Sequence, residues 1–92
     1  MKHLLTCDVE LELEAAVEYY DACLEDLGDQ FLDEFHAALQ RITAFPQAWT
    51  PLSPTTRRCV LNRFPFSLVY SIEEDHVLVL GLMHMRRMPK KW

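Results

Sequence analysis

The sequence has no apolar run long enough to cross a bilayer. Its longest apolar stretch, VLVLGLM, lies between His76 and His84, whereas a transmembrane helix needs about 20 consecutive apolar residues. The first ten residues, MKHLLTCDVE, also lack the apolar segment of a secretory signal peptide. We therefore expect a protein that has no contact with a membrane and is not secreted.

Cysteine is scarce and its spacing is uninformative. The three cysteines, Cys7, Cys23 and Cys59, are odd in number and include no C-x-x-C pair. The histidines show no metal-ligand spacing either. These observations predict a reduced, cytoplasmic protein without a metal site, and no motif in the sequence indicates a cofactor.

The charges are distributed unequally along the 92 residues, although the net charge is only −5. Residues 1–45 contain two basic and eleven acidic side chains, whereas residues 46–92 contain seven basic and three acidic ones. Such an asymmetry is typical of proteins that bind a charged partner or a polyanion. The acidic residues also fit a simpler interpretation, namely the solvated face of a helix.

The first half of the chain predicts a short strand and a helical hairpin. Residues 2–5 can form an opening strand, and Thr6 or Asp8 can cap the helix that follows. Apolar residues then recur at steps of four and three, which indicates one face of an amphipathic helix: Val9, Leu13, Ala16, Tyr20, Cys23 and Leu27. Gly28 is suited to the end of this helix and Asp29 to the N-cap of the next. The second helix repeats the pattern up to a proline-rich loop: Phe31, Phe35, Ala38, Ile42 and Phe45.

The second half predicts a loop followed by three strands. The segment PQAWTPLSPTT contains three prolines, which forbid a regular helix. RRCVLNRF, FSLVYSI and HVLVLGLMH are rich in β-branched and aromatic residues, and the polar turn at 73–75 makes the last two antiparallel neighbours. The predicted fold is α+β, in the order β-α-α-β-β-β, with a helical hairpin on one face of a mainly antiparallel twisted sheet. It occupies one domain, residues 1–92.

Three segments, in their order and spacing, carry a family resemblance. They are EAAVEYYDACLEDLGDQFLDEFHAALQRITAFPQAW, then RFPFSLVY, then VLVLGLMH followed by Arg-Arg and Pro-x-x-Trp. In these features the chain resembles the RelE/ParE superfamily of bacterial toxins from type II toxin–antitoxin systems. It is more similar to the ParE-like branch, often labelled plasmid stabilisation proteins. The resemblance implies a small toxin that a cognate antitoxin protein holds inactive by wrapping around the sheet and the hairpin.

The resemblance implies one of two activities. ParE-like members poison DNA gyrase through a protein-binding surface, whereas RelE-like members cut messenger RNA in the ribosome. RelE-like nucleases commonly have an arginine before the Leu-Val-Tyr of the central strand, where this sequence has Ser67. His84 matches a candidate acid or base of some nucleases, but the aromatic hydroxyl that often follows it is Met85 here. We therefore favour gyrase binding. The alternatives are a ribosome-dependent endoribonuclease and a non-toxic remnant that only binds antitoxin.

Two sets of candidate site residues follow. If the chain is a ribonuclease, we expect catalysis by His84, Arg63 and Arg86. If it binds proteins instead, we expect the contact surface to include Arg58, Arg63, Arg86, Arg87, Trp92 and Tyr20. Because Arg58 and Arg63 differ in parity along one predicted strand, they are expected on opposite faces of the sheet. Simpler interpretations are a hydrogen-bonded strand-end histidine, solvated arginines, and tryptophans at positions 49 and 92 that pack.

Overall fold

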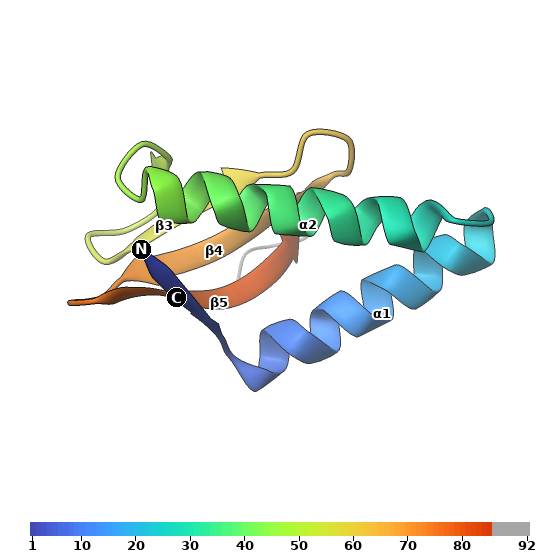
Figure 1. Cartoon of the computed structure of the whole chain (residues 1–92), viewed down its shortest axis with the longest axis horizontal. Coiled ribbons are helices and arrows are strands. Elements are labelled where there is room, and N and C mark those ends of the chain that lie inside the picture. Colours follow the sequence, from blue (N-terminus) through green and yellow to red (C-terminus); the bar gives the residue numbers. More distant parts are fainter. Residues whose placement is uncertain (86–92) are drawn as a thin grey trace.

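The computed structural model describes residues 1–85, which form two helices and five strands (Figure 1). In chain order the elements are β1 (Lys2–Leu5), α1 (Cys7–Cys23), α2 (Leu27–Ala44), β2 (Thr50–Pro51), β3 (Thr56–Val60), β4 (Phe66–Ile72) and β5 (His76–His84). The predicted order is confirmed, with one addition. Strand β2 lies inside the segment predicted as a loop, and its proline is tolerated because β2 is an edge strand.

The sheet has the strand order β1-β5-β4-β3-β2. The β1–β5 pair is parallel and the other three pairs are antiparallel, so the sheet is mixed but mainly antiparallel, as predicted. The β4–β5 register shifts between Val69 and Tyr70, because Val69 pairs with Gly81 and Tyr70 with Val79. A shift of this kind bends a strand and increases its twist.

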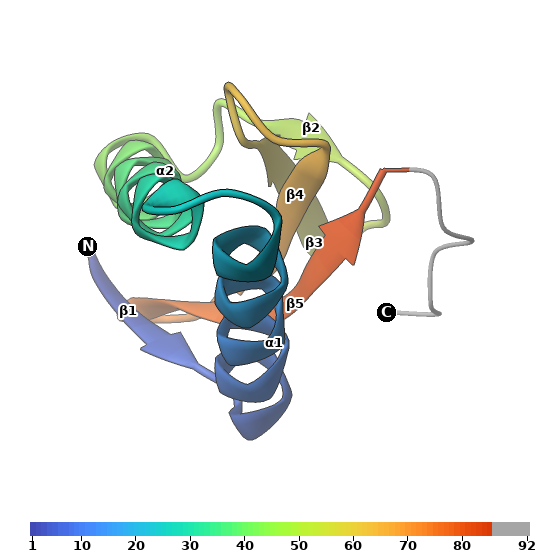
Figure 2. The same ribbon diagram turned by 90° about the vertical axis from the view of Figure 1, so that its right-hand side faces the viewer.

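Both helices cover the same face of the sheet (Figures 1 and 2). Their apolar residues meet those of β4 and β5 in one core, which includes Val9, Phe31, Phe35, Ala38, Ile42, Leu68, Tyr70, Val77, Val79 and Leu82. Thr6 caps α1, since its hydroxyl accepts a hydrogen bond from the Val9 N–H at 3.3 Å. The predicted hairpin on one sheet face is therefore confirmed.

The junction between the helices differs from the prediction. Helix α1 ends at Cys23, and Gly28 lies in the first turn of α2 instead of ending α1. The N-cap position of α2 belongs to Asp26, whose φ of 64° is left-handed, and Asp29 lies inside the helix. Glycine is required at position 28 by close packing, because a Cβ there would lie 2.5 Å from Asp21 Cγ and 2.6 Å from the Val17 carbonyl oxygen.

Three further residues differ from the predictions. Cys23 and Phe45 were expected on the buried helix faces, but each lies at a helix end and is exposed, Phe45 by 68%. Strand β3 ends at Val60, so Arg63 lies in the turn before β4. The alternation that predicted opposite sheet faces for Arg58 and Arg63 therefore does not reach position 63.

Candidate partner-binding surface

A groove of about 620 Å³ lies between α1 and the ends of β4 and β5. Its lining residues come from two turns of α1 and from the helix-facing side of the two strands: Glu12, Ala15, Ala16, Tyr19, Tyr20, Phe66, Leu82 and His84. The small side chains of Ala15 and Ala16 leave the space that a larger residue would fill. At one end of the groove the Leu82 N–H donates a hydrogen bond to Glu12 Oε1 at 3.3 Å.

The other end of the groove is aromatic. The Tyr20 ring stacks on Phe31 at 5.2 Å between centroids and meets the edges of Phe64 and Phe66 at 4.9 and 6.3 Å. The Phe66 ring in turn lies 5.0 Å from the His84 ring, edge to face. Burial raises the pKa of the Tyr20 hydroxyl, and the neighbouring Tyr19 raises it further. Tyr20 is therefore a half-buried packing residue and also forms part of the groove wall.

As predicted for adjacent residues on a helix, one of Tyr19 and Tyr20 faces the core and the other faces outward. Tyr20 packs against the core, whereas Tyr19 is 65% exposed and lies against its neighbour at 5.3 Å. Sequence reasoning named Tyr20 as the partner-binding residue of the two. In the structure Tyr19 is the more accessible of the two groove residues. The sequence signal that could have identified it is an aromatic side chain on the exposed side of an acidic helix.

The predicted basic residues do not form one cluster among residues 1–85. Arg63 is exposed in the turn before β4, where it donates to Gln30 Oε1 of α2 at 2.6 Å. Arg58 lies on β3 next to the buried core residue Cys59, so alternation places it on the sheet face opposite the helices. Its Nε is buried and has no hydrogen-bond acceptor among residues 1–85. Arg86, Arg87 and Trp92 lie outside the described residues.

The nuclease candidates are also separated. Arg63 lies over the Phe64 ring at 5.9 Å, whereas His84 contacts a different ring of the cluster, Phe66, at 5.0 Å. Ser67 is fully buried, and its hydroxyl has no hydrogen-bond partner within the described part of the chain. The geometry thus brings no arginine beside His84 among residues 1–85.

Two other arginines fasten the proline-rich loop. Arg57 Nη1 donates to the carbonyl oxygens of Gln47 and Trp49 at 3.0 and 2.8 Å. Arg41 Nη2 donates to the Val60 carbonyl at 3.1 Å, and its own carbonyl accepts from Trp49 Nε1 at 3.2 Å. Trp49 is therefore a packing residue, as its simpler interpretation held. One positive charge of residues 46–92, that of Arg57, therefore has a structural role.

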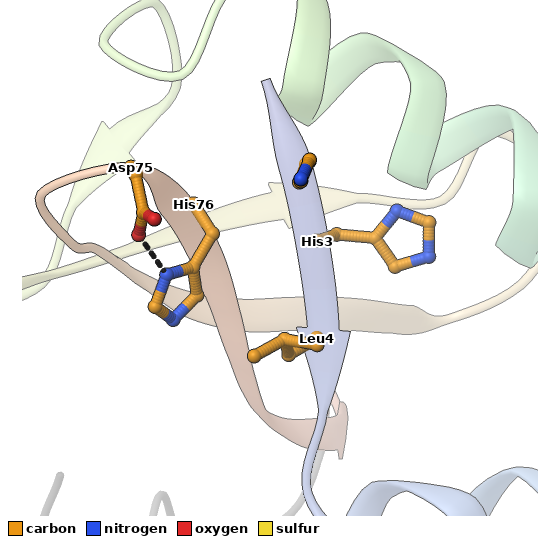
Figure 3. A pocket seen from close by; sticks show the side chains of 5 residues that line it. His3, Leu4, Asp75 and His76 are labelled. Carbon is orange, nitrogen blue, oxygen red and sulfur yellow. Dashed lines mark hydrogen bonds and ion pairs between the residues drawn. The ribbon is translucent and has the colours of Figure 1, made fainter.

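A shallow hollow of about 410 Å³ lies at the far end of the sheet, where β1 meets β5. His76 Nδ1 and Asp75 Oδ1 are hydrogen-bonded at 2.7 Å, and this bond holds the pKa of the exposed Asp75 carboxyl below its usual range (Figure 3). His3 points away from this pair, toward α2 (Figure 3).

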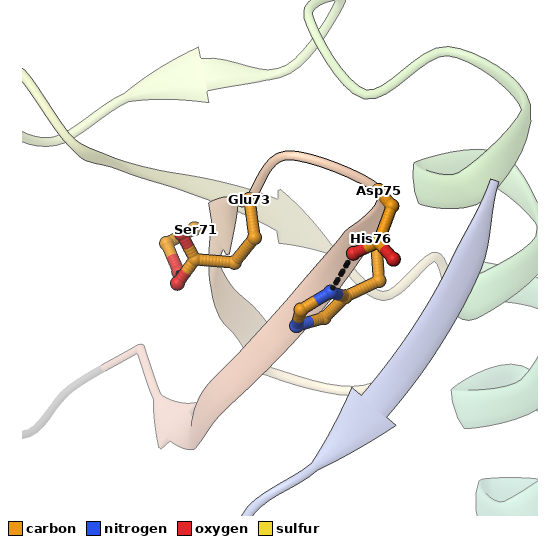
Figure 4. A network of polar contacts seen from close by, with 4 residues as sticks. All are labelled: Ser71, Glu73, Asp75 and His76. Atoms are coloured by element: carbon orange, nitrogen blue, oxygen red, sulfur yellow. Dashed lines mark hydrogen bonds and ion pairs between the residues drawn. The ribbon is translucent and has the colours of Figure 1, made fainter.

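The neighbouring Ser71 hydroxyl donates to Glu73 Oε1 at 3.3 Å, on the other side of the turn (Figure 4). Within residues 1–85, no three His, Cys, Asp or Glu side chains are grouped so that they could hold a metal ion. The polar contacts at this end of the sheet belong to the β4–β5 turn. In that turn the Glu73 N–H donates to the His76 carbonyl at 2.8 Å.

A helical hairpin lies on one face of a mainly antiparallel sheet, with a groove beside the first helix, and these features define a small α+β domain. The family model described as "ParE toxin of type II toxin-antitoxin system, parDE" matches residues 4–89. The chain therefore belongs to the ParE toxin family, which confirms the predicted branch.

A solved structure has the same fold. The chain is similar to a structure titled "Chromosomal ParDE TA system from P. aeruginosa", with a TM-score of 0.81 and 14% sequence identity. The match covers 94% of this chain and 97% of that one. Compared by sequence with curated proteins, the chain has no match. Neither helix within residues 1–85 is long and apolar enough to cross a membrane.

Proposed function

We propose that the chain is the toxin component of a type II toxin–antitoxin system, that it acts in the cytoplasm by binding DNA gyrase, and that a cognate antitoxin neutralises it. The observation that carries this proposal is the match of residues 4–89 to the ParE toxin family. The similar structure from P. aeruginosa is described by its title as a ParDE system, which supports an antitoxin partner.

The geometry near β4 favours protein binding over RNA cleavage. Cleavage at a 2′-hydroxyl needs a base, an acid and cations that stabilise the charged phosphorane. Ser67 occupies the position of the usual nuclease arginine and is fully buried. His84 packs against Phe66, whereas Arg63 lies over Phe64. His84 keeps a ribosome-dependent nuclease as the second candidate function.

A DNA supercoiling assay tests the proposed target. Purified chain is added in excess to gyrase and relaxed plasmid, and we expect supercoiling to stop, with cleaved DNA accumulating. Topoisomerase I relaxation in the same buffer is the control and should continue. Full gyrase activity at excess toxin would overturn the proposed target. Primer extension on translated messages after induction then tests the nuclease alternative, which predicts cuts linked to codons.

The partner-binding residues can be tested in the same assay. Arg63 is an exposed cation beside the aromatic cluster, so Arg63→Ala should weaken gyrase inhibition by about threefold to tenfold, as expected for one charged contact at an interface rim. Lys2→Ala, an exposed cation on β1, is the matched control and should leave inhibition unchanged. Equal inhibition by both variants would remove Arg63 from the proposed surface.

Neutralisation is tested by growth. Induction of the chain alone should arrest growth, and co-expression of its antitoxin should restore it. Normal growth on induction would instead favour a remnant that has kept only antitoxin binding.

A further inference from the structure

Strand β1 carries a histidine on the sheet face that the helices cover. In the parallel β1–β5 pair, His3 lies beside Val77. Paired residues of neighbouring strands project to the same face of a sheet, and Val77 is a fully buried residue of the core. His3 therefore projects to the helix side, and its ring is directed toward α2 (Figure 3).

Helix α2 presents a second histidine to the same hollow. This hollow has a volume of about 210 Å³ and is lined by one residue of β1 and four residues of α2: His3, His36, Leu39, Gln40 and Thr43. The four α2 positions are separated by three, four and seven residues from the first, so they lie on one side of the helix. That side of α2 therefore faces β1.

A main-chain contact fixes β1 against α2. The Met1 amino group donates to the Thr43 carbonyl at 3.2 Å, so β1 begins beside the last turn of α2 (Figures 1 and 2). From this contact His3 lies about 7 Å along β1, and His36 lies about 10 Å back along α2. Similar distances from one fixed contact, together with the shared hollow, place both rings within reach of one ion.

Both rings have nitrogen atoms available to a ligand. Neither His3 nor His36 makes a hydrogen bond or an ion pair within residues 1–85, and the His36 ring lies beside Phe35 at 5.8 Å between centroids. His76, in contrast, is hydrogen-bonded to Asp75. The neutral imidazole nitrogen is the commonest metal ligand in proteins and suits Zn²⁺.

We propose that His3 and His36 bind a zinc ion between β1 and α2, with the Gln40 amide oxygen as third ligand and water in the fourth position of a tetrahedral site. This donor set is two histidines and an amide, and it differs from a cluster of three His, Cys, Asp or Glu side chains, which residues 1–85 do not contain. The net charge of −5 favours a cation. The ion joins an edge strand, which pairs only with β5, to the helix that builds the core.

Isothermal titration calorimetry with ZnCl₂ tests the site on the full chain, purified without a histidine tag. We expect one zinc ion per chain, and His3→Ala and His36→Ala should each weaken binding at least tenfold. His76→Ala removes another histidine near β1 and is the matched control, with unchanged affinity expected. Absence of binding, or binding that persists without either His3 or His36, would overturn the proposal. Circular dichroism shows whether each variant is folded.

A substitution that should strengthen binding tests the third ligand. Gln40→Glu replaces the neutral oxygen with a carboxylate at the same position, so zinc should bind at least threefold more tightly. Gln47→Glu adds the same charge to an exposed loop residue outside this hollow and should leave the affinity unchanged. Equal affinities of the two variants would contradict the role of Gln40.

Zinc should also stabilise the chain at the proposed place. A free zinc concentration ten times the Kd should raise the Tm by about 6–11 °C in the wild type and in His76→Ala, but not in His3→Ala. Hydrogen exchange measured by mass spectrometry should slow at residues 1–5, because the ion fixes β1 to α2. Slower exchange elsewhere without a change in β1 would contradict the site. These measurements use only the chain and zinc, so their outcome does not depend on gyrase or antitoxin.

Discussion

The two helices of the hairpin are similar in length but bury very different parts of their surface. Helix α2 buries six residues, Gly28, Phe31, Phe35, Ala38, Leu39 and Ile42, whereas α1 buries only Val9 and Ala16. Leu11 and Tyr19 of α1 are each 65% exposed. Helix α2 therefore builds the core, and α1 retains apolar surface of the kind that partners cover.

Removal of a core side chain from α2 should give the largest effect on stability. Phe35 is 1% exposed, so Phe35→Ala removes most of a buried ring and leaves a cavity. We expect a loss of about 3–5 kcal/mol in the free energy of unfolding, measured by urea denaturation. Leu11→Ala on α1 is the control, with an expected change within about 0.5 kcal/mol. Similar losses for the two variants would refute the division of roles between the helices.

The contact between the helices should be the next most sensitive point. Gly28→Ala places a Cβ against Asp21 and the Val17 carbonyl, and backbone atoms cannot move aside as a flexible side chain can. We expect a loss of about 1–3 kcal/mol, as for other overpacked sites. Asp29→Ala, an exposed neighbour in α2, serves as control and should change stability little. A neutral Gly28→Ala would show that the hairpin can open at this end.

A tyrosine in the sheet links the core to the loop after α2. The Tyr70 hydroxyl donates to the Pro46 carbonyl, and Tyr70→Phe should cost about 1 kcal/mol below pH 10. Burial raises the pKa of Tyr70 to about 12, above the usual value of 10, so folding favours its neutral form. That stabilisation is complete below pH 10 and is lost as the pH rises through about 12.

Urea denaturation of both proteins from pH 8 to pH 12 measures this effect. The difference between wild type and Tyr70→Phe should shrink across the upper part of that range. A constant difference would mean that the hydroxyl does not titrate from a buried, hydrogen-bonded state. Tyr20→Phe provides the comparison on α1, where the raised pKa of a half-buried ring should give a weaker dependence.

The smallest stability effect is expected where partner binding should change most. Tyr19→Ser removes an exposed ring from the groove wall, so the free energy of unfolding should change by only about 0.5 kcal/mol. Binding of the proposed antitoxin, measured by isothermal titration calorimetry, should weaken about tenfold or more. A variant that loses stability but keeps its affinity for the antitoxin would reverse the roles assigned to α1 and α2.

The sequence predicted this fold well because its periodicities are strong. Phe31, Phe35, Ala38 and Ile42 follow one helical stripe, and all four are buried. The predictions failed where a local signal has two meanings. Gly28 was interpreted as a helix end, but its cause is the approach of a second helix, which a one-dimensional pattern does not contain. Phe45 continued the stripe in sequence after α2 had already ended.

The candidate site was less predictable than the fold. His84 and Tyr20 were named from motif and periodicity, and the structure places both at the groove. Glu12 was counted only among the eleven acidic residues of the first half of the chain. Its contact with Leu82 joins residues 70 positions apart, and no local spacing reveals such a contact. Arg57 has a structural role, since it binds two carbonyl oxygens of the loop. The sequence could not distinguish it from Arg58, because the position of those carbonyls depends on the fold.

The two margins of the sheet are chemically unequal. Strand β2 is only two residues long and contains Pro51, which has no N–H to offer to another chain. The β1–β5 margin contains a main-chain donor, the Leu82 N–H, that a carboxylate satisfies. A sheet that can accept a strand at one margin only can join a single partner, but it cannot propagate. Even at the high local concentrations of overexpression, edge pairing between copies should therefore stop at two molecules instead of forming fibres.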